Sequence, residues 1–212
     1  ICSACINHKR KNIINWKGRE KGLKKILNSI KKKNKIYDCL IPVSGGKDST
    51  WQTLKCLELG LRPLALTWKT PFRSEIGNKN LNNLINLGVD HIDWTINPKF
   101  EKKVLIEALK KKGSTAILMH MAIFNIPQMV ASKFNIPLII WGENSAYEYA
   151  NEKNIAKNST LTKDWFKKFG VTDNFKIDKS IKKNKGYSLL FQNSFLGKKT
   201  KVRSIFLGHY YN

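Results

Sequence analysis

The chain has 212 residues, a formal net charge of +24 and a hydrophobic fraction of 42% that includes six tryptophans. This length and composition predict one folded α/β domain with appendages and argue against a disordered chain. No apolar run reaches the roughly 20 residues of a membrane-spanning helix. The basic start after Ile1 does not resemble a signal peptide, so we expect a cytoplasmic protein.

The chain opens with a basic segment that leads into a first strand–turn–helix unit. At 22–33, apolar residues at helical spacing lie among lysines, which predicts a surface helix ahead of the core. The short apolar run 37–43 ends at a glycine-rich turn, as a buried parallel strand does. Apolar residues at 51, 54 and 57, followed by Gly60, predict a helix over 49–59.

The alternation of strand and helix then repeats. The next predicted elements are strands at 63–68, 91–96 and 137–141 and helices at 80–87, 100–112 and 116–134. We expect Pro127 to kink or divide the last of these helices. The alternation predicts a doubly wound, Rossmann-like parallel sheet, in which ligands bind at the carboxyl ends of the strands. Residues 44–49 and 142–144 both fall at such ends.

The composition changes after Tyr149. Residues 150–186 are rich in Lys, Asn and Asp with scattered aromatics, which favours a helical insertion or a lid over the site, and 204–212 resembles a strand entering a turn. We divide the chain into a basic, partly zinc-ribbon-like segment (1–35), a nucleotide-binding domain (36–149) and a truncated C-terminal part (150–212). We expect a fragment of a longer protein.

The four cysteines fall into two groups. Cys39 lies in an apolar strand and Cys56 on the following helix, so both are predicted core residues. Cys2 and Cys5 form a C-x-x-C pair, which supplies two of the four thiolates of a tetrahedral zinc site. One pair is an incomplete site, so we expect zinc only in a longer protein.

The net charge of +24 has two interpretations. One is a surface that binds nucleic acid. The other is the codon bias of an AT-rich genome, because lysine greatly outnumbers arginine and both Asn and Ile are abundant. Surfaces that read phosphate favour arginine for its bidentate geometry. We favour compositional bias, which leaves nucleic acid as the less favoured partner.

The segment Ser44-Gly45-Gly46-Lys47-Asp48-Ser49 carries the strongest chemical signal. A strand that feeds a Gly-Gly turn and then a helix presents backbone N–H groups and the positive helix end to an anion. Lys47 supplies a cation for a polyphosphate, and the Ser44 and Ser49 hydroxyls are donors to its oxygens. Asp48 is suited to holding Mg²⁺ that bridges a pyrophosphate. The spacing is not that of a Walker A loop.

A second polar segment, Gly142-Glu143-Asn144, follows the predicted strand 137–141. At the ligand edge of the sheet, Glu143 and Asn144 are candidates to bind a metal, a ribose or an activated amide. A plain polar turn, with Asn144 capping a helix that begins at Ser145, is the alternative.

The segment 44–49 resembles the signature S-G-G-x-D-S of the PP-loop ATP pyrophosphatases, also called adenine nucleotide alpha hydrolases, at all five fixed positions. The resemblance implies that ATP is cleaved between its α and β phosphates. AMP is transferred to an oxygen, pyrophosphate leaves, and a nitrogen or sulfur nucleophile then displaces AMP. By the same resemblance, adenine lies near Leu66, Thr67 and Trp68, and Lys47 and Asp48 act at phosphorus.

A narrower resemblance extends along most of the chain, to the N-acetyl sugar amidotransferases of lipopolysaccharide and related surface-polysaccharide biosynthesis. It rests on these segments: 2–5 (CSAC), 41–49 (IPVSGGKDS), 66–68 (LTW), 80–81 (NL), 88–90 (GVD), 142–144 (GEN) and 206–208 (FLG). A first C-x-x-C that precedes the C-S-A-C pair in such proteins is missing here.

That resemblance implies a concrete reaction. The acetamido oxygen of a nucleotide-activated N-acetyl sugar attacks the α-phosphate of ATP, and ammonia then displaces AMP to give an acetamidino sugar. A separate glutaminase subunit supplies the ammonia, since the sequence shows no obvious Cys-His glutaminase centre. ATP and Mg²⁺ are the implied cofactors.

Two other functions compete with this one. A PP-loop enzyme that thiolates or aminates a tRNA base would suit the positive charge and the C-x-x-C pair, although no recognisable RNA-binding module is present. A non-catalytic nucleotide-binding subunit of a glutaminase complex is the third interpretation.

Overall fold

A computed structural model of the chain describes residues 2–31, 36–143, 160–161, 175, 179–183 and 202–211. Within them lies a five-stranded sheet with the order β3-β2-β1-β4-β5 and parallel pairing throughout. Its strands are Cys39–Pro42 (β1), Pro63–Trp68 (β2), Asp90–Trp94 (β3), Leu138–Trp141 (β4) and Arg203–Phe206 (β5). The predicted fold class is therefore confirmed.

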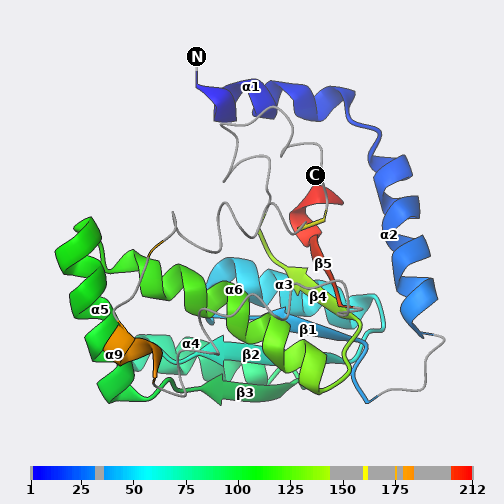
Figure 1. Cartoon of the computed structure of the whole chain (residues 1–212). Coiled ribbons are helices and arrows are strands. Elements are labelled where there is room, and N and C mark those ends of the chain that lie inside the picture. The colour runs from blue at the N-terminus through cyan, green and yellow to red at the C-terminus, as the bar shows by residue number, and fades with distance from the viewer. Residues whose placement is uncertain are drawn as a thin grey trace.

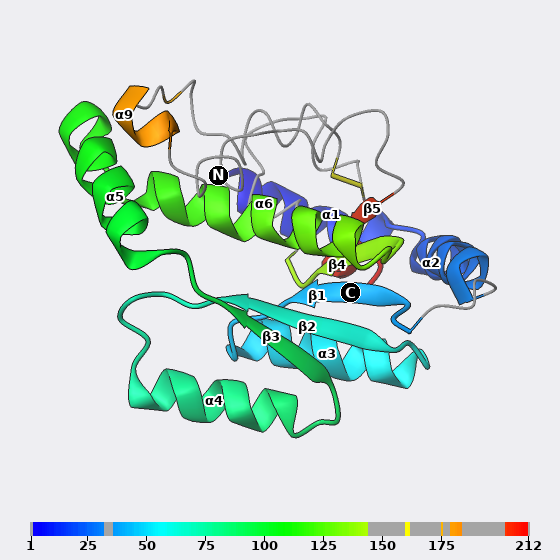
Figure 2. The ribbon, with the colours of Figure 1, turned by 60° about the horizontal axis from the view of Figure 1, so that its bottom comes forward.

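Helices cover both faces of this sheet, as Figures 1 and 2 show. The helix α3 and its neighbour α4 lie on one face, and α6 with α5 beside it lies on the other. The helical elements are Ser3–Arg10 (α1), Lys11–Ile13 (η1), Trp16–Lys31 (α2), Lys47–Glu58 (α3), Glu75–Ile85 (α4), Pro98–Lys112 (α5), Ala116–Lys133 (α6), Lys179–Lys182 (α9) and Leu207–His209 (η6).

The sheet divides the core into two apolar clusters. In β1, Leu40 packs into the cluster under α5 and α6, while Cys39 and Ile41 pack into the cluster under α2 and α3. Because successive strand residues point to opposite faces, a strand covered on both sides reads as a continuous apolar run. The predicted core positions of Cys39 and Cys56 are confirmed, since both side chains are fully buried.

Two helices begin more than a full turn before the position that the apolar pattern predicted, and a polar cap explains each case. The helix expected over 22–33 starts at Trp16, where Asn15 Oδ1 accepts a 2.8 Å hydrogen bond from the N–H of Gly18. The helix expected over 80–87 starts at Glu75, where Ser74 Oγ accepts from the N–H of Gly77. Such a cap accepts a hydrogen bond from a free N–H group of the first turn, so the helix can begin there even where no apolar residue marks its start.

The helix α6 runs without a break through Pro127, contrary to the expected division. Its packing against β1, β2 and β4 holds it on the sheet, and most of its residues after Met119 are buried. The packing of this apolar helix therefore outweighs the loss of one intrahelical hydrogen bond.

The C-terminal part is described only in pieces. Most of the insertion predicted at 150–186 lies outside the described residues, which there include Leu161 and Phe175, both buried in the cluster under α6, and the short α9. The strand expected after Ser204 is present as β5 and is followed by η6. The division at residues 35 and 149 stays a prediction.

Candidate functional site

The turn between β1 and α3 is built around Gly45. This residue has φ +83°, and a Cβ added there would lie 2.7 Å from the backbone nitrogen of Leu81. A side chain would thus be strained and would also collide with the backbone of α4. Gly46 is the N-cap of α3, so the positive end of the helix faces outward from the turn.

Two serine hydroxyls hold the turn in shape. Ser49 Oγ donates to the carbonyl of Gly46 at 3.0 Å and accepts from the N–H of Ser44 at 3.3 Å. Ser44 Oγ accepts from the N–H of Gly46 at 3.3 Å. The Ser49 proton is thus used inside the turn, whereas the Ser44 hydroxyl retains its proton for a ligand.

The two charged residues of the turn form an ion pair. Lys47 Nζ lies 2.6 Å from Asp48 Oδ1, and the two side chains are 89% and 72% exposed. Asp48 lines the neighbouring cavity, while Lys47, Gly45 and Gly46 are outside its wall. A surface pair of this kind adds little stability, so both side chains are free to re-pair with a polyphosphate and its metal.

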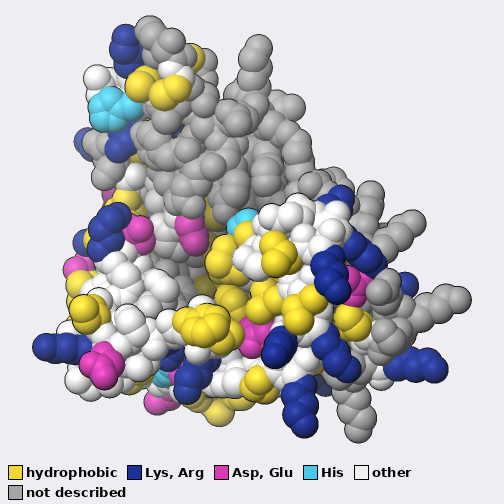
Figure 3. Space-filling view, turned by 90° about the vertical axis from the view of Figure 1, so that its left-hand side faces the viewer, with side chains coloured by type: hydrophobic (Ala, Val, Ile, Leu, Met, Phe, Trp, Pro, Cys, Tyr) yellow, Lys and Arg dark blue, Asp and Glu magenta, His cyan; other side chains and the backbone are white. Residues whose placement is uncertain are grey.

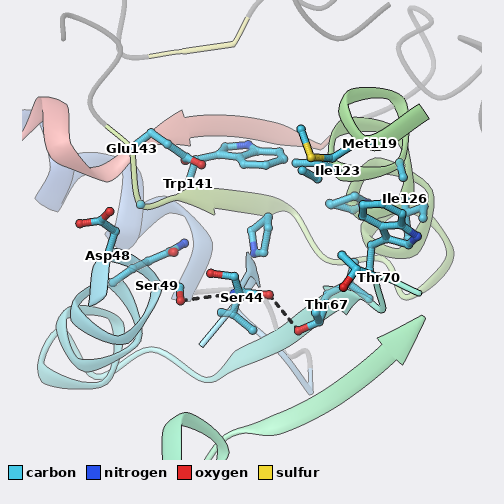
Figure 4. A pocket seen from close by; sticks show the side chains of 18 residues that line it. Ser44, Asp48, Ser49, Thr67, Thr70, Met119, Ile123, Ile126, Trp141 and Glu143 are labelled. Carbon is cyan, nitrogen blue, oxygen red and sulfur yellow. Dashed lines mark hydrogen bonds between the residues drawn. The ribbon is translucent and has the colours of Figure 1, made fainter. Parts of the chain in front are cut away.

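A cavity of about 480 Å³ opens beside the turn. It lies between α6 and the carboxyl ends of β1, β2 and β4, and Figure 4 shows its labelled side chains converging from these elements. The predicted site residues among its lining are Ser44, Asp48, Ser49, Leu66, Thr67, Trp68, Gly142 and Glu143. The lining residues that the sequence interpretation missed include Gln52, Thr70, Met119, Ala122, Ile123, Ile126, Pro127 and Trp141.

Thr67 ties the turn to the edge of the sheet. Its Oγ1 donates to the carbonyl of Val43 at 2.8 Å and lies 2.9 Å from Nε2 of His91. Since the one hydroxyl proton goes to Val43, the imidazole Nε2–H donates to Thr67. His91 of β3 therefore holds Thr67 of β2, and Thr67 in turn holds the carbonyl of Val43, the residue before Ser44.

The end of β4 approaches α3 at Gly142. A Cβ there would lie 2.9 Å from Gln52 Oε1, so glycine allows this close approach. The Gln52 side chain is buried, and its Nε2 donates to the carbonyl of Ile140. Its amide oxygen consequently faces away from that carbonyl, beside Gly142 and the cavity that Gln52 lines.

Glu143 is the second carboxylate of the cavity. Its Oε2 is buried and has no hydrogen-bond partner among the described residues. Burial raises the pKa of this carboxyl above its ordinary value, and the nearby charge of Asp48 raises it further. Asp48 and Glu143 thus place two carboxylates beside each other, and one Glu143 oxygen has no hydrogen-bond partner among the described residues. Carboxylate oxygens are the ligands that Mg²⁺ prefers. Asn144, predicted beside them, lies outside the described residues.

The structure brings the predicted zinc pair, Cys2 and Cys5, together. Cys2 Sγ and Cys5 Sγ lie 3.4 Å apart at the start of α1, and this contact raises the pKa of the Cys5 thiol. Within the described ranges, no group of three or more His, Cys, Asp or Glu side chains could hold a metal ion. The pair alone does not complete a tetrahedral site.

The far end of the cavity is apolar. Met119, Ile123 and Ile126 of α6 form one wall, and Trp141, whose ring packs 5.1 Å from that of Phe124, forms the other. The indole nitrogen of Trp141 is buried and lacks a hydrogen-bond partner in the described part of the chain, whereas the Trp68 indole interacts with the carboxyl group of Glu101. Because buried indole N–H groups usually find an acceptor, Trp141 is a candidate donor to a ligand at this apolar end.

Comparison with known proteins identifies the fold. No protein-family model matches the sequence, and no curated protein does. The structure is similar to that of an NH3-dependent NAD synthetase from Campylobacter jejuni, with a TM-score of 0.50 and 15% identity over 66% of this chain and 62% of that one. The similarity places the chain among parallel α/β folds of this kind.

Two further structures align with lower scores. An NMN synthetase from Francisella tularensis gives a TM-score of 0.44 and 19% identity over 63% of this chain and 56% of that one. A predicted subunit of tRNA methyltransferase from Methanocaldococcus jannaschii gives 0.38 and 21% over 58% of each chain. The chain thus spans less than two-thirds of the length of each of the three proteins it matches.

Proposed function

We propose that this chain binds ATP at the turn between β1 and α3, transfers AMP to an acceptor oxygen and releases pyrophosphate. The turn itself carries the proposal. Gly45 in the left-handed region, the open N-terminus of α3 and the Ser44 hydroxyl form a concave anion site beside a cavity large enough for the rest of a ligand.

Asp48 and Glu143 would hold the magnesium ion. Both line the cavity, and the unsatisfied Glu143 oxygen is the observation that fits a cation there. When bound, Mg²⁺ supplies charge neutralisation for the leaving pyrophosphate. Lys47, released from its ion pair with Asp48, would balance phosphate charge from outside the cavity wall.

The acceptor we propose is the acetamido oxygen of a nucleotide-activated N-acetyl sugar. The only charged side chains that line the cavity are, among the described residues, those of Asp48 and Glu143, and both are acidic. Because no cationic side chain lines the cavity among the described residues, the lining suits a neutral amide better than a carboxylate, which would lack an ion-pair partner there. The amide oxygen attacks the α-phosphate, ammonia then attacks the amide carbon, and AMP leaves with that oxygen.

The ammonia would come from a separate glutaminase subunit. The motifs shared with N-acetyl sugar amidotransferases support this part of the proposal, together with the acetamidino product and its use in lipopolysaccharide or a related glycan. The chain's own contribution to the second step is orientation, since the cavity keeps the activated amide beside the turn.

Pyrophosphate release tests the proposal. The chain is incubated with ATP, Mg²⁺, ammonium chloride and UDP-N-acetylglucosamine, and pyrophosphate and AMP are quantified with each component left out in turn. We expect release that depends on ATP, Mg²⁺ and the sugar nucleotide. ATP binding without any release would instead support the non-catalytic nucleotide-binding subunit.

A tRNA titration distinguishes the sugar amidotransferase from the second candidate function, the modification of a tRNA base. The charge of +24 favours a polyanionic substrate if it is functional. Affinity for tRNA that falls steeply with salt, with pyrophosphate release stimulated by tRNA and not by sugar nucleotide, would replace the sugar acceptor by a base. The adenylating step would stand in either case.

A further inference from the structure

The exposed side of α5 differs from the rest of this basic chain. The two acidic residues of this helix, Glu101 and Glu107, are both buried. One side of the helix exposes Lys99, Lys102, Lys103, Ile106, Leu109 and Lys110, which we call the α5 face. Lys111 is exposed outside this face and pairs with Glu107 at 2.5 Å. This face therefore combines lysines and aliphatic side chains and contains no carboxylate.

The spacing along α5 places the aliphatic residues among the lysines. At 100° per residue, Ile106 lies near the middle of the exposed arc, with Lys102 on one side and Lys103 on the other. Ile106 is 44% exposed and Leu109 is 53% exposed. An apolar centre bordered by long basic side chains is the pattern of a helix that lies in a membrane interface.

The basic helix α2 gives the opposite arrangement. Its apolar residues, including Leu23 and Leu27, are buried against the sheet, and Glu20 on its exposed side pairs with Lys24 at 2.7 Å. This helix therefore buries its apolar stripe and exposes an acidic residue among its lysines. Lysine abundance accounts for the basic residues of both helices but not for the exposed aliphatic residues of the α5 face.

The α5 face lies at the end of the molecule where the strands finish. The carboxyl end of β3 points toward α5, and α6, which begins shortly after α5 ends, lines the cavity. Figure 3 views this end and shows hydrophobic side chains in the surface with Lys and Arg along their border. A surface that contacts this end would lie near the cavity.

We propose that the α5 face binds an anionic membrane surface peripherally. The lysines contact lipid phosphates, and Ile106 and Leu109 insert among the first carbons of the acyl chains. A phosphate backbone of nucleic acid would leave the two exposed aliphatic residues without a role, and the face offers no arginine for bidentate contacts. No helix in the described ranges is long and apolar enough to cross a membrane.

Vesicle co-sedimentation of the full chain tests this proposal. Vesicles of phosphatidylcholine alone are compared with vesicles that contain about one-third phosphatidylglycerol, at low and high salt. We expect binding to the anionic vesicles only, weakened by salt. The triple change Lys102→Gln, Lys103→Gln and Lys110→Gln should lower the partition coefficient by about fivefold per lysine, or roughly a hundredfold in total.

A second variant and a matched control separate this surface from general charge. Ile106→Ser with Leu109→Ser removes apolar contact without changing charge, and we expect about a tenfold loss of binding. The control is Lys17→Gln, Lys21→Gln and Lys25→Gln on α2, which changes charge equally and should lower binding much less. Equal losses in both lysine triples, no effect of the serine pair, or binding to an RNA oligonucleotide without binding to anionic vesicles would overturn the proposal.

Discussion

The two ends of the cavity are built in different ways. At the polar end, Ser44, Asp48 and Ser49 come from one short turn, and Asp48 extends into solvent. At the apolar end, Ile126 and Trp141 come from distant parts of the chain and are buried in the main core cluster. The polar end is formed by one short segment at the edge of the sheet, whereas the apolar end is part of the hydrophobic core of the domain.

This difference separates the consequences of substitution. A change at the polar end removes a chemical group from a surface turn and should affect ligand binding or catalysis with little loss of stability. A change at the apolar end leaves a gap in a packed core and should affect stability first. The first two predictions below each test one side of that separation, and the third concerns a glycine in the turn where stability and binding are expected to change together.

The largest expected effect is on catalysis, from Asp48→Asn. The carboxylate that would hold Mg²⁺ becomes neutral, so we expect pyrophosphate release to fall by about a hundredfold or more. Since Asp48 is exposed, the free energy of unfolding should change by less than about 0.5 kcal/mol. Glu58→Gln, an exposed acid on the same helix that pairs with Lys55, is the matched control. Unchanged release by Asp48→Asn would remove the metal assignment.

The next effect is on stability, from Ile126→Ala. This side chain is almost fully buried and belongs to the core cluster, so its truncation should lower the free energy of unfolding by about 2–4 kcal/mol. Met119→Ala, at the exposed rim of the same wall, should cost less than about 1 kcal/mol. Urea unfolding followed by fluorescence measures both. Equal costs for the two variants would mean that the apolar end is not part of the core.

A third prediction concerns the turn, where one substitution should lower both stability and ATP binding. Gly45→Ala places a Cβ 2.7 Å from the Leu81 nitrogen at positive φ, and we expect a cost of about 2–3 kcal/mol with loss of ATP binding. Gly88→Ala also has positive φ, but no atom lies within 4 Å of the added carbon. It should cost about 1 kcal/mol and leave ATP binding unchanged. Equal losses of stability and ATP binding in the two variants would show that the contact between a Gly45 Cβ and the Leu81 nitrogen is not the cause.

The smallest effect is a pH dependence that Glu143 contributes. Because its folded pKa is raised, the unfolded chain loses this proton first as the pH increases. The contribution of Glu143 to stability is complete below the ordinary value of 4.5 and is lost as the pH rises through the folded pKa. Glu143→Gln should flatten this slope, and Mg²⁺ should reduce it in the unaltered chain.

An exposed acid provides the control for that slope. Glu20 has a lowered pKa because of its hydrogen bond with Lys24, so its contribution has the opposite sign. Glu20→Gln should therefore leave the fall in stability above pH 4.5 in place. Unfolding curves over a pH series decide between these outcomes, and an unaltered slope in Glu143→Gln would contradict the assignment.

The sequence was informative where chemistry is local. The bounds 63–68 of β2 and the turn at 44–49 were predicted because strand hydrophobicity and glycine pairs act over a few residues. The cavity wall of α6 was not, since an apolar helix shows no sign of which residues face a ligand rather than the core. Gln52 was missed for the same reason: its role depends on Ile140 and Gly142, which the fold brings to it.

Pro127 gives the apolar wall one property that its side chains do not have. A proline nitrogen carries no hydrogen, so the carbonyl of Ile123, four residues earlier in the helix, does not receive the usual hydrogen bond from residue 127. Both residues line the cavity. A ligand with an N–H or amino group that reached this carbonyl would find a main-chain acceptor within an otherwise apolar wall. Selectivity of this kind comes from the backbone, and side-chain substitutions along the wall would leave it intact.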